Sequence, residues 1–270
     1  MSSPLHFSSF VEQGARPSAT LAINERVNQL WAEGKVVYHL GFGESRFPVH
    51  PRIAEALRAN AFQKTYLPSQ GLEPLREKVA EFYTNHFGLA ASPEQVIIAP
   101  GSKALIYALL YSLEGDLLLP TPSWVSYQAQ ARMIGKRVHW IPSSAAEGYP
   151  LRVEALDAIV RAGGNQPGIL LINTPSNPTG RMLNPEFVKE LVDYSRGRGL
   201  TVLSDEIYGL VQYGRKPHDS IARYYPEGAV VLGGLSKHLS LGGWRLGVAI
   251  VPRGVAGARH HRVEAVPARR

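Results

Sequence analysis

Residues 168–208 read GILLINTPSNPTGRMLNPEFVKELVDYSRGRGLTVLSDEIY, and this stretch decides the fold. It contains two short apolar runs, Gly168–Asn173 and Leu200–Ser204, with a helical pattern at Pro185–Ser195 between them. Continuous runs of leucine and β-branched residues are typical of strands that are covered on both faces. A strand, a helix and a second strand in this order predict one unit of a mainly parallel α/β sheet.

The same alternation extends to both sides of this unit and predicts an α/β fold. We expect a seven-stranded, mainly parallel sheet with helices on both faces, formed by a large domain of residues 51–252. The further strands are expected at Val96–Ala99, Asp116–Leu119, Arg137–Ile141, Ala229–Leu232 and Leu246–Val251. The helices between them are expected at Ser102–Leu113, Ser123–Ile134 and Leu151–Arg161.

The N-terminal part of the chain follows a different pattern. Helical patterns at Arg52–Asn60 and Leu72–Phe87 are separated by the loops GFGESRFPVHP and YLPSQG, which are rich in proline and glycine. Such loops do not continue the strand and helix alternation. We therefore expect residues 1–50 to form an N-terminal arm and part of a smaller layer, not a separate folded domain.

Composition and charge exclude several classes of protein. The net charge is +7, but residues 253–270 hold five arginines and one glutamate and so carry +4 of it. The remaining body has no basic cluster with interleaved aromatic residues, so we expect no nucleic-acid partner. The chain has no cysteine, which excludes disulfides, thiolate metal sites and cysteine nucleophiles, and we expect no metal site.

The sequence also gives an expectation for location. No apolar run reaches the roughly 18 residues that a membrane-spanning helix needs. The first residues, MSSPLHFSSF, lack the basic and apolar regions of a secretory signal. We therefore expect no membrane association and a cytoplasmic location.

The loops that follow the predicted strands contain the candidate functional residues, because open α/β sheets bind ligands beyond the carboxyl ends of their strands. After the first strand, Gly101, Ser102 and Lys103 open a helix whose free N–H groups and dipole favour a phosphate. A serine at this position also serves as a simple helix cap. After the second strand, Trp124 could stack on a flat ring or pack in the core.

The later strand-end loops add an acid, a phenol and two cations. Asn177 lies in the loop after the fourth strand, and Asp205 and Tyr208 follow the fifth. After the sixth come Lys237 and then Arg245, in a glycine-rich segment. Taken singly, Asp205 could be a helix cap and Lys237 could be a solvated side chain.

Together these residues match the needs of one kind of cofactor. A planar, phosphorylated cofactor that carries an aldehyde needs a lysine with which to form a Schiff base. It also needs an acid near its pyridine nitrogen, and phosphate donors that include an arginine. All of these groups lie in strand-end loops of the same predicted sheet.

Several motifs carry a resemblance to a known family. The segments NTPSNPTG (173–180), SDEIY (204–208) and SKHLSLGGWRLG (236–247) resemble those of class I and II aminotransferases, enzymes of fold type I that depend on pyridoxal 5'-phosphate. The segments YLPSQGLEPLRE and TPSW agree with the same family. The similarity runs from about Gly41 to Pro252.

The resemblance implies roles for the residues near the cofactor ring. Lys237 would form the Schiff base and then move the proton during catalysis. Asp205 would pair with the pyridine nitrogen and keep it protonated. Asn177 and Tyr208 would bond the ring oxygen, and Trp124 would stack on the ring. The catalytic residues are thus expected to be Lys237, Asp205 and Tyr208.

The resemblance also implies a phosphate site, substrates and a partner. Gly101, Ser102 and Lys103 match the phosphate-binding turn, and Ser236 and Arg245 would complete it. The substrates would be an amino acid and a 2-oxoacid. Two further positions have implied contacts beyond the cofactor. Gly43 matches a backbone contact to the substrate carboxylate, and Tyr66 matches a tyrosine that reaches the phosphate of a neighbouring subunit, which implies a homodimer with shared active sites.

The resemblance stops near Pro252. Family members continue into a C-terminal small domain, which supplies the arginine that binds the substrate carboxylate. Residues 253–270 instead resemble an unrelated basic tail, so we expect the small domain to be missing. A truncated homologue that binds the cofactor with little or no turnover is one alternative, and a lyase or synthase on the same fold is another. A dinucleotide-binding protein is not favoured, because no G-x-G-x-x-G follows a predicted strand.

Overall fold

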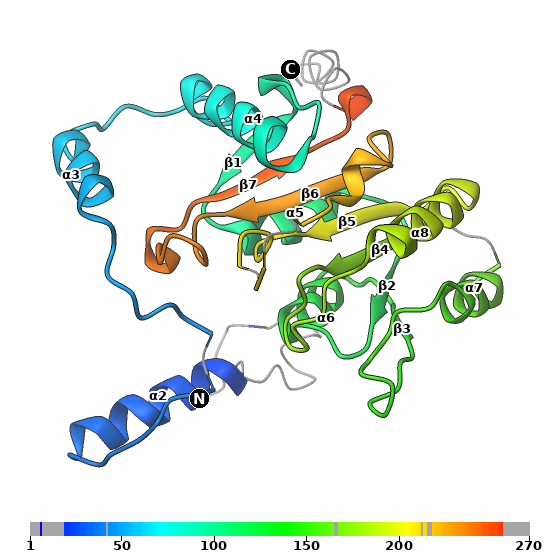
Figure 1. Ribbon diagram of the computed structural model, residues 1–270, viewed down its shortest axis with the longest axis horizontal. Coiled ribbons are helices and arrows are strands. Elements are labelled where there is room, and N and C mark those ends of the chain that lie inside the picture. Colours follow the sequence, from blue (N-terminus) through cyan, green and yellow to red (C-terminus); the bar gives the residue numbers. More distant parts are fainter. Residues whose placement is uncertain are drawn as a thin grey trace.

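A computed structural model describes His6 and residues 19–41, 43–164, 167–211, 213–214 and 218–255 of the chain. Its central feature is a seven-stranded sheet with the strand order β1-β7-β6-β5-β4-β2-β3 (Figure 1). The strands are β1 (Val96–Ala99), β2 (Asp116–Pro120), β3 (Val138–Ile141), β4 (Gly168–Asn173), β5 (Thr201–Asp205), β6 (Ala229–Gly234) and β7 (Gly247–Ile250).

Strand β7 is the one strand of this sheet that runs against its neighbours. It pairs antiparallel with β1 on one side and with β6 on the other, whereas the pairs β2–β3, β2–β4, β4–β5 and β5–β6 are parallel. The carboxyl ends of the other six strands therefore lie at one edge of the sheet, together with the amino end of β7. This arrangement confirms the predicted mainly parallel sheet.

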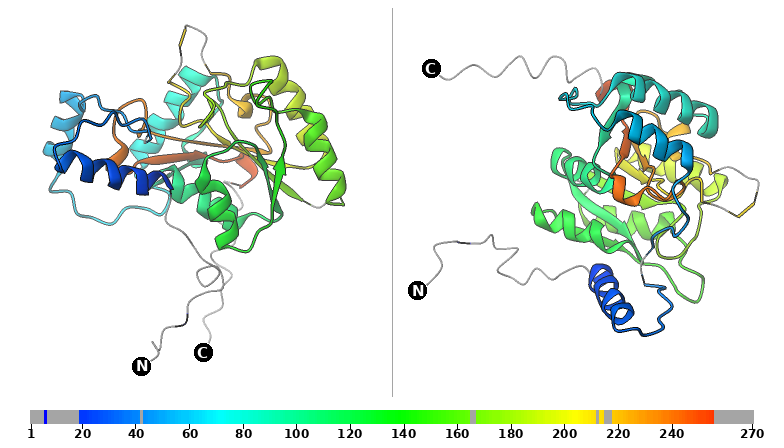
Figure 2. Two further views of the ribbon diagram at one scale, coloured as in Figure 1. Left: turned by 90° about the horizontal axis from the view of Figure 1, so that it is seen from below. Right: turned by 90° about the vertical axis from the view of Figure 1, so that its left-hand side faces the viewer.

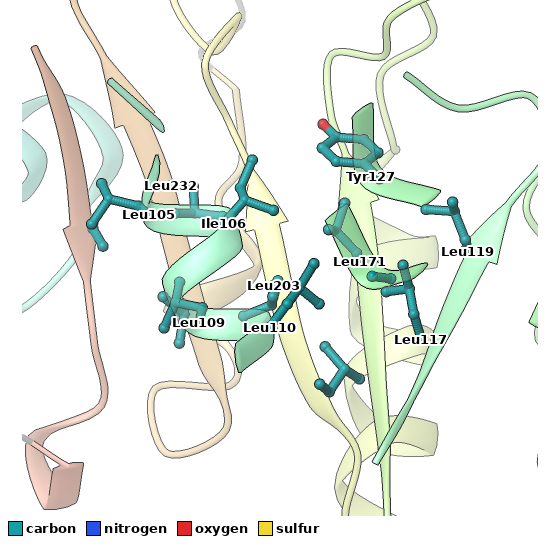
Figure 3. Packing of buried hydrophobic residues seen from close by; sticks show 14 of the residues in the cluster. Leu105, Ile106, Leu109, Leu110, Leu117, Leu119, Tyr127, Leu171, Leu203 and Leu232 are labelled. Atoms are coloured by element: carbon teal, nitrogen blue, oxygen red, sulfur yellow. The ribbon is translucent and has the colours of Figure 1, made fainter. Parts of the chain in front are cut away.

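Helices cover both faces of the sheet, as predicted. The helices are α2 (Ala19–Ala32), α3 (Pro51–Asn60), α4 (Glu73–Phe87), α5 (Ser102–Ser112), α6 (Val125–Met133), α7 (Val153–Ala162) and α8 (Pro185–Gly197). Side chains along a strand alternate between the faces. In β4, Leu171 packs in the cluster under α5 and α6, whereas Leu170 and Ile172 pack in the cluster under α7 and α8. Figure 3 shows the leucines of α5 in front of the sheet, near Leu203 and Leu232.

Local sequence explains where the helices begin and end. The Asn184 side chain accepts a hydrogen bond from the backbone N–H of Phe187 at 2.7 Å, and Pro185 occupies the first position of α8. Both features favour the start of a helix. Helix α4 ends at Gly88, whose φ of 64° is a left-handed conformation that glycine adopts readily.

The N-terminal segment contains one helix that the sequence patterns did not indicate. Helix α2 lies within the predicted arm of residues 1–50, and together with α3 it lies to one side of the layered α/β body (Figures 1 and 2). Residues 256–270, most of the predicted tail, lie outside the described residues. The division into arm, large domain and tail stays a prediction. Within the described ranges, no helix has the length and apolar character needed to cross a membrane.

The packing of β4 predicts a large effect of a single truncation. Leu171 is fully buried between α5, α6 and the sheet, so Leu171→Ala should lower the free energy of unfolding by about 2–5 kcal/mol through the cavity that it creates. Urea unfolding followed by circular dichroism would measure this change. Leu57→Ala, at a half-exposed position of α3, is the matched control and should change the stability by less than about 1 kcal/mol.

Candidate active site

The predicted site residues come from the edge of the sheet where six strands end. Trp124 follows β2, Asn177 follows β4, and Asp205 is the last residue of β5. Lys237 lies three residues after β6. Arg245 reaches the same edge because β7 begins there, with Gly247 paired to both Ala99 and Gly234. Strand direction alone thus gathers residues that are up to 144 positions apart in the sequence, from Gly101 to Arg245.

Asp205 is the buried acid of this edge. Its side chain is only 2% exposed. One carboxylate oxygen, Oδ2, accepts a hydrogen bond of 2.6 Å from the hydroxyl of Tyr127, and Oδ1 accepts one of 3.2 Å from the backbone N–H of Ile207. Burial raises the pKa of Asp205 to about 6, against the lowering effect of these hydrogen bonds and of the Lys237 charge.

Tyr127 is a contributor that the sequence patterns did not single out. It is 1% exposed, it lies on the first turn of α6, and its ring meets Trp124 edge to face at 5.2 Å. Figure 3 shows its hydroxyl beyond the packed leucines, toward the edge where β4 and β5 end. The available signal was its spacing, since it follows Trp124 by three residues and so lies on the same face of the helix.

Asn177 and Tyr208 lie side by side, as their predicted shared role requires. A hydrogen bond joins their side chains, and burial followed by the nearby Asp205 charge raises the pKa of Tyr208. Asn173 positions this loop. Its side-chain oxygen accepts from the backbone N–H of Asn177 at 2.6 Å, and its amide donates to the backbone oxygen of Asp205 at 2.8 Å. Asn173 was also not among the predicted site residues.

Lys237 is partly buried in the middle of the cluster. Its Nζ donates to the backbone oxygen of Gly43 at 2.7 Å and lies 5.5 Å from the centroid of the Tyr208 ring. Burial lowers the pKa of Lys237, and the nearby Arg245 adds to the lowering, whereas Asp205 and Glu44 act in the opposite direction. A lowered pKa favours the neutral amine, which is the nucleophilic form.

The expected phosphate turn has the geometry of an anion site. Gly101, with φ +89°, precedes the first residue of α5, and a Cβ added at Gly101 would collide with the Arg245 guanidinium. Arg245 Nη1 also donates to the backbone oxygen of Gly242 at 2.7 Å. The guanidinium therefore lies at the N-terminus of α5, beside Ser102. Backbone N–H groups at a helix start and an arginine are strong donors to phosphate.

Two further residues were predicted for this phosphate site, Ser236 and Lys103. Ser236 directly precedes Lys237 and is half-buried. The side chain of Lys103 lies over Trp124, with Nζ 5.0 Å from the ring centroid. It therefore forms a cation–π contact with the ring predicted to stack on the cofactor.

The two residues predicted to contact substrate or partner differ in their placement. Gly43 joins the cluster through its contact with Lys237, and the neighbouring hydroxyls of Ser45 and Ser240 lie 2.6 Å apart, which fastens this segment to the Lys237 loop. Tyr66 is fully exposed and so contacts none of the other predicted residues within this single chain.

A second buried acid directly follows the last residue of β5. Glu206 accepts hydrogen bonds at Oε1 from the hydroxyls of Ser204 at 2.8 Å and Ser220 at 2.9 Å. Its Oε2 lies 3.1 Å from Nε2 of the fully buried His218. Tyr208 lies between Glu206 and Ser220 in the sequence. The hydrogen bond between these two residues therefore helps to fix the position of Tyr208.

A cavity of about 240 Å³ adjoins the Asn177 loop. Its wall includes Ser143, Tyr149, Asn173 and Asn177, but neither Asp205 nor Lys237. The candidate site is therefore formed by the converging side chains of the sheet edge and not by this cavity.

Comparisons with known proteins agree with this geometry. The sequence model of the family "Aminotransferase class I and II" matches residues 35–265. The chain therefore belongs to this family. An aspartate aminotransferase from Geobacillus stearothermophilus is 36% identical over 250 residues, which are 90% of this chain and 63% of that protein. One from Bacillus subtilis is 33% identical over 241 residues, 86% of this chain and 61% of that protein.

Solved structures lead to the same family. An aspartate aminotransferase from Thermus thermophilus with maleate superposes with a TM-score of 0.87 at 29% identity, over 94% of this chain and 66% of that one. The predicted fold and family resemblance are thus confirmed. The chain spans less than two thirds of the length of the two bacillary relatives.

The burial of Asp205 predicts how the stability of the cofactor-free protein depends on pH. Its pKa rises on folding from 3.8 to about 6, so the folded protein holds this proton more tightly than the unfolded chain does. The resulting stabilisation is complete below pH 4 and is lost as the pH rises through 6. Between pH 4 and 7, the wild type should therefore lose about 2 kcal/mol more of its free energy of unfolding than Asp205→Asn loses.

Urea unfolding of both proteins at several pH values would measure this difference. The asparagine keeps the shape of the side chain and an oxygen for Tyr127, and the other titrating groups are the same in both proteins. Parallel stability curves would show that Asp205 titrates as it does in the unfolded chain.

Proposed function

We propose that this chain binds pyridoxal 5'-phosphate and acts as an aminotransferase that transfers an amino group between an amino acid and a 2-oxoacid. The observation that carries the proposal is the convergence of Lys237, Asp205 and Arg245 at one sheet edge. Buried Asp205 and partly buried Lys237 are close enough for each charge to shift the other's pKa, and Arg245 lies at the start of α5.

The residues of this edge fit the cofactor. The helix start at Ser102 and the Arg245 guanidinium would hold its phosphate, with Ser236 alongside. Asp205 would accept a hydrogen bond from its ring nitrogen, and the paired Asn177 and Tyr208 would hold its ring oxygen. When bound, pyridoxal phosphate supplies an aldehyde that condenses with amines and a ring that draws electrons from the bonds of the attached substrate.

The side chains of the chain itself divide the remaining work. Asp205, as a buried carboxylate, would keep a proton on the ring nitrogen, because an opposite charge at short range favours the protonated form. Nζ of Lys237 would take the proton from the α-carbon of the substrate and later return it, which is general acid–base catalysis by a positioned amine. Trp124 would cover one face of the site and exclude water from it.

Relatives suggest the substrate, and the surface suggests the partner. Two of the most similar relatives are named aspartate aminotransferases, so we propose aspartate as the amino donor. The segment from Val36 to Leu67 exposes large apolar side chains, at 85% for Val36, 95% for Leu40 and 100% for Tyr66. Such a surface supports a homodimer in which Tyr66 reaches the site of the partner.

Absorbance spectroscopy tests the cofactor half of the proposal. The wild type mixed with pyridoxal phosphate should develop the visible band of lysine-bound cofactor, and borohydride should fix the label on Lys237. Lys237→Ala should lose both signals because it removes the amine that would form the Schiff base. The control Lys189→Ala, on the exposed surface of α8, should retain them. A band that persists in Lys237→Ala would contradict the assignment.

Supplying aspartate tests the transfer half. In the cofactor-loaded wild type, aspartate alone should bleach the visible band and release oxaloacetate, and 2-oxoglutarate should restore the band. Asp205→Ala should slow the bleaching by about a hundredfold or more, because it removes the carboxylate that would keep the ring nitrogen protonated. Cofactor binding with no response to any amino acid would show that this chain binds without turnover.

A further inference from the structure

The carboxylate of Asp205 has two hydrogen-bond donors of unequal quality. The backbone N–H of Ile207 reaches Oδ1 at 3.2 Å, whereas the Tyr127 hydroxyl reaches Oδ2 at 2.6 Å. A short hydrogen bond from a hydroxyl to a carboxylate is among the stronger contacts in proteins. Among the described residues, Tyr127 is therefore the principal hydrogen-bond partner of this acid.

Tyr127 has little freedom to leave this contact. Its ring is buried among the residues of the core cluster that α5 and α6 form with the sheet, and Trp124 packs on it edge to face. Burial and the neighbouring Asp205 charge raise the pKa of Tyr127 well above its ordinary value, so the hydroxyl keeps its proton. The phenol is thus a fixed, neutral donor whose hydroxyl bonds one oxygen of the acid.

The surroundings of Asp205 make this donor matter. Lys237 is the cation that favours the carboxylate, whereas Glu206 opposes its charge; Tyr83 of α4 and Tyr208 are the further titratable groups within its electrostatic reach. Desolvation already raises the pKa of Asp205 to about 6. Without the Tyr127 hydroxyl, the balance would shift further toward the protonated acid at neutral pH.

We propose that Tyr127 is a positioning residue that holds the Asp205 carboxylate in its ionised form and in one orientation, so that its other oxygen faces the ring nitrogen of the cofactor. The inference rests on the proposed function for the identity of the cofactor. The contact itself is a property of this chain alone. In this role Tyr127 would act through Asp205 and not directly on cofactor or substrate.

The test compares two buried tyrosines. Tyr127→Phe removes the hydroxyl that bonds Asp205. The control Tyr225→Phe, at a residue 5% exposed, removes a hydroxyl that donates at 3.0 Å to the backbone oxygen of Leu200, at the other end of β5. Both substitutions keep the ring and lose one buried hydrogen bond, so circular dichroism and urea unfolding should show folded proteins of similar stability.

The first readout needs no cofactor. Carbon-13 NMR of the labelled aspartate carboxyl, assigned with Asp205→Asn, follows the titration of Asp205 in the apo-protein. We expect Tyr127→Phe to raise the midpoint to about 7 or above, and Tyr225→Phe to leave it at the wild-type value. Equal midpoints in wild type and Tyr127→Phe would overturn the proposal, whether or not the protein binds pyridoxal phosphate.

The second readout is the dissociation constant of pyridoxal phosphate. It should rise about tenfold or more in Tyr127→Phe, as expected when a hydrogen bond to a charged group is lost. In the Asp205→Asn background the same substitution should have less than about a twofold effect, because Tyr127 would then have no charge to hold. Equal effects in both backgrounds would show a merely structural tyrosine. Failure of the wild type to bind the cofactor would count against the proposed function, and the apo titration would still decide the role of Tyr127.

Discussion

The direction of the strands is the constraint on which the whole site depends. A mainly parallel sheet brings the carboxyl ends of its strands to one edge, and here β1, β2, β4, β5 and β6 each end in a loop with a polar residue. Strand β7 runs the other way and so delivers Arg245 from its amino end. The close approach of backbones at Gly247, where a Cβ would collide with the Gly101–Ser102 turn, brings the guanidinium to the start of α5.

Burial then decides the chemical character of the residues that the sheet has gathered. Asp205 and Lys237 are drawn into a poorly hydrated edge, where each is less readily charged than in water, and each restores part of the other's charge. Neutral groups add further hydrogen bonds. The Tyr127 hydroxyl donates to the Asp205 carboxylate, and the backbone N–H of Asn177 donates to the Asn173 side chain, which fixes the loop after β4. Reactivity at this edge therefore depends on the groups acting together, because the pKa values of Asp205 and Lys237 each depend on the charge of the other.

Much of this could be predicted from the sequence, and the exceptions have physical reasons. Apolar runs located all seven strands because buried strands carry a continuous signal, and Gly168–Asn173 is reproduced residue for residue. Motif resemblance indicated Lys237, Asp205 and Arg245. Helix α2 was missed because its apolar positions are scattered and many stay exposed. Tyr127 and Asn173 were missed because their contacts with Asp205 join residues 78 and 32 positions apart. The spacing of Tyr127 from Trp124 indicates a shared helix face but not the contact with Asp205.

Side chains alternate along β5 and the residue that follows it, so the two adjacent acids have opposite surroundings. Asp205 faces Tyr127 of α6, whereas Glu206 faces His218 and the serines of the other layer. A gain or loss of one residue within this strand would exchange their faces. The Glu206 side chain, which is longer by one methylene, would then point at Tyr127. Asp205 would instead be buried beside the imidazole of His218. An insertion or deletion of one residue within β5 should therefore be tolerated far less well than one in the loops on either side. This should hold even where the amino-acid composition is unchanged.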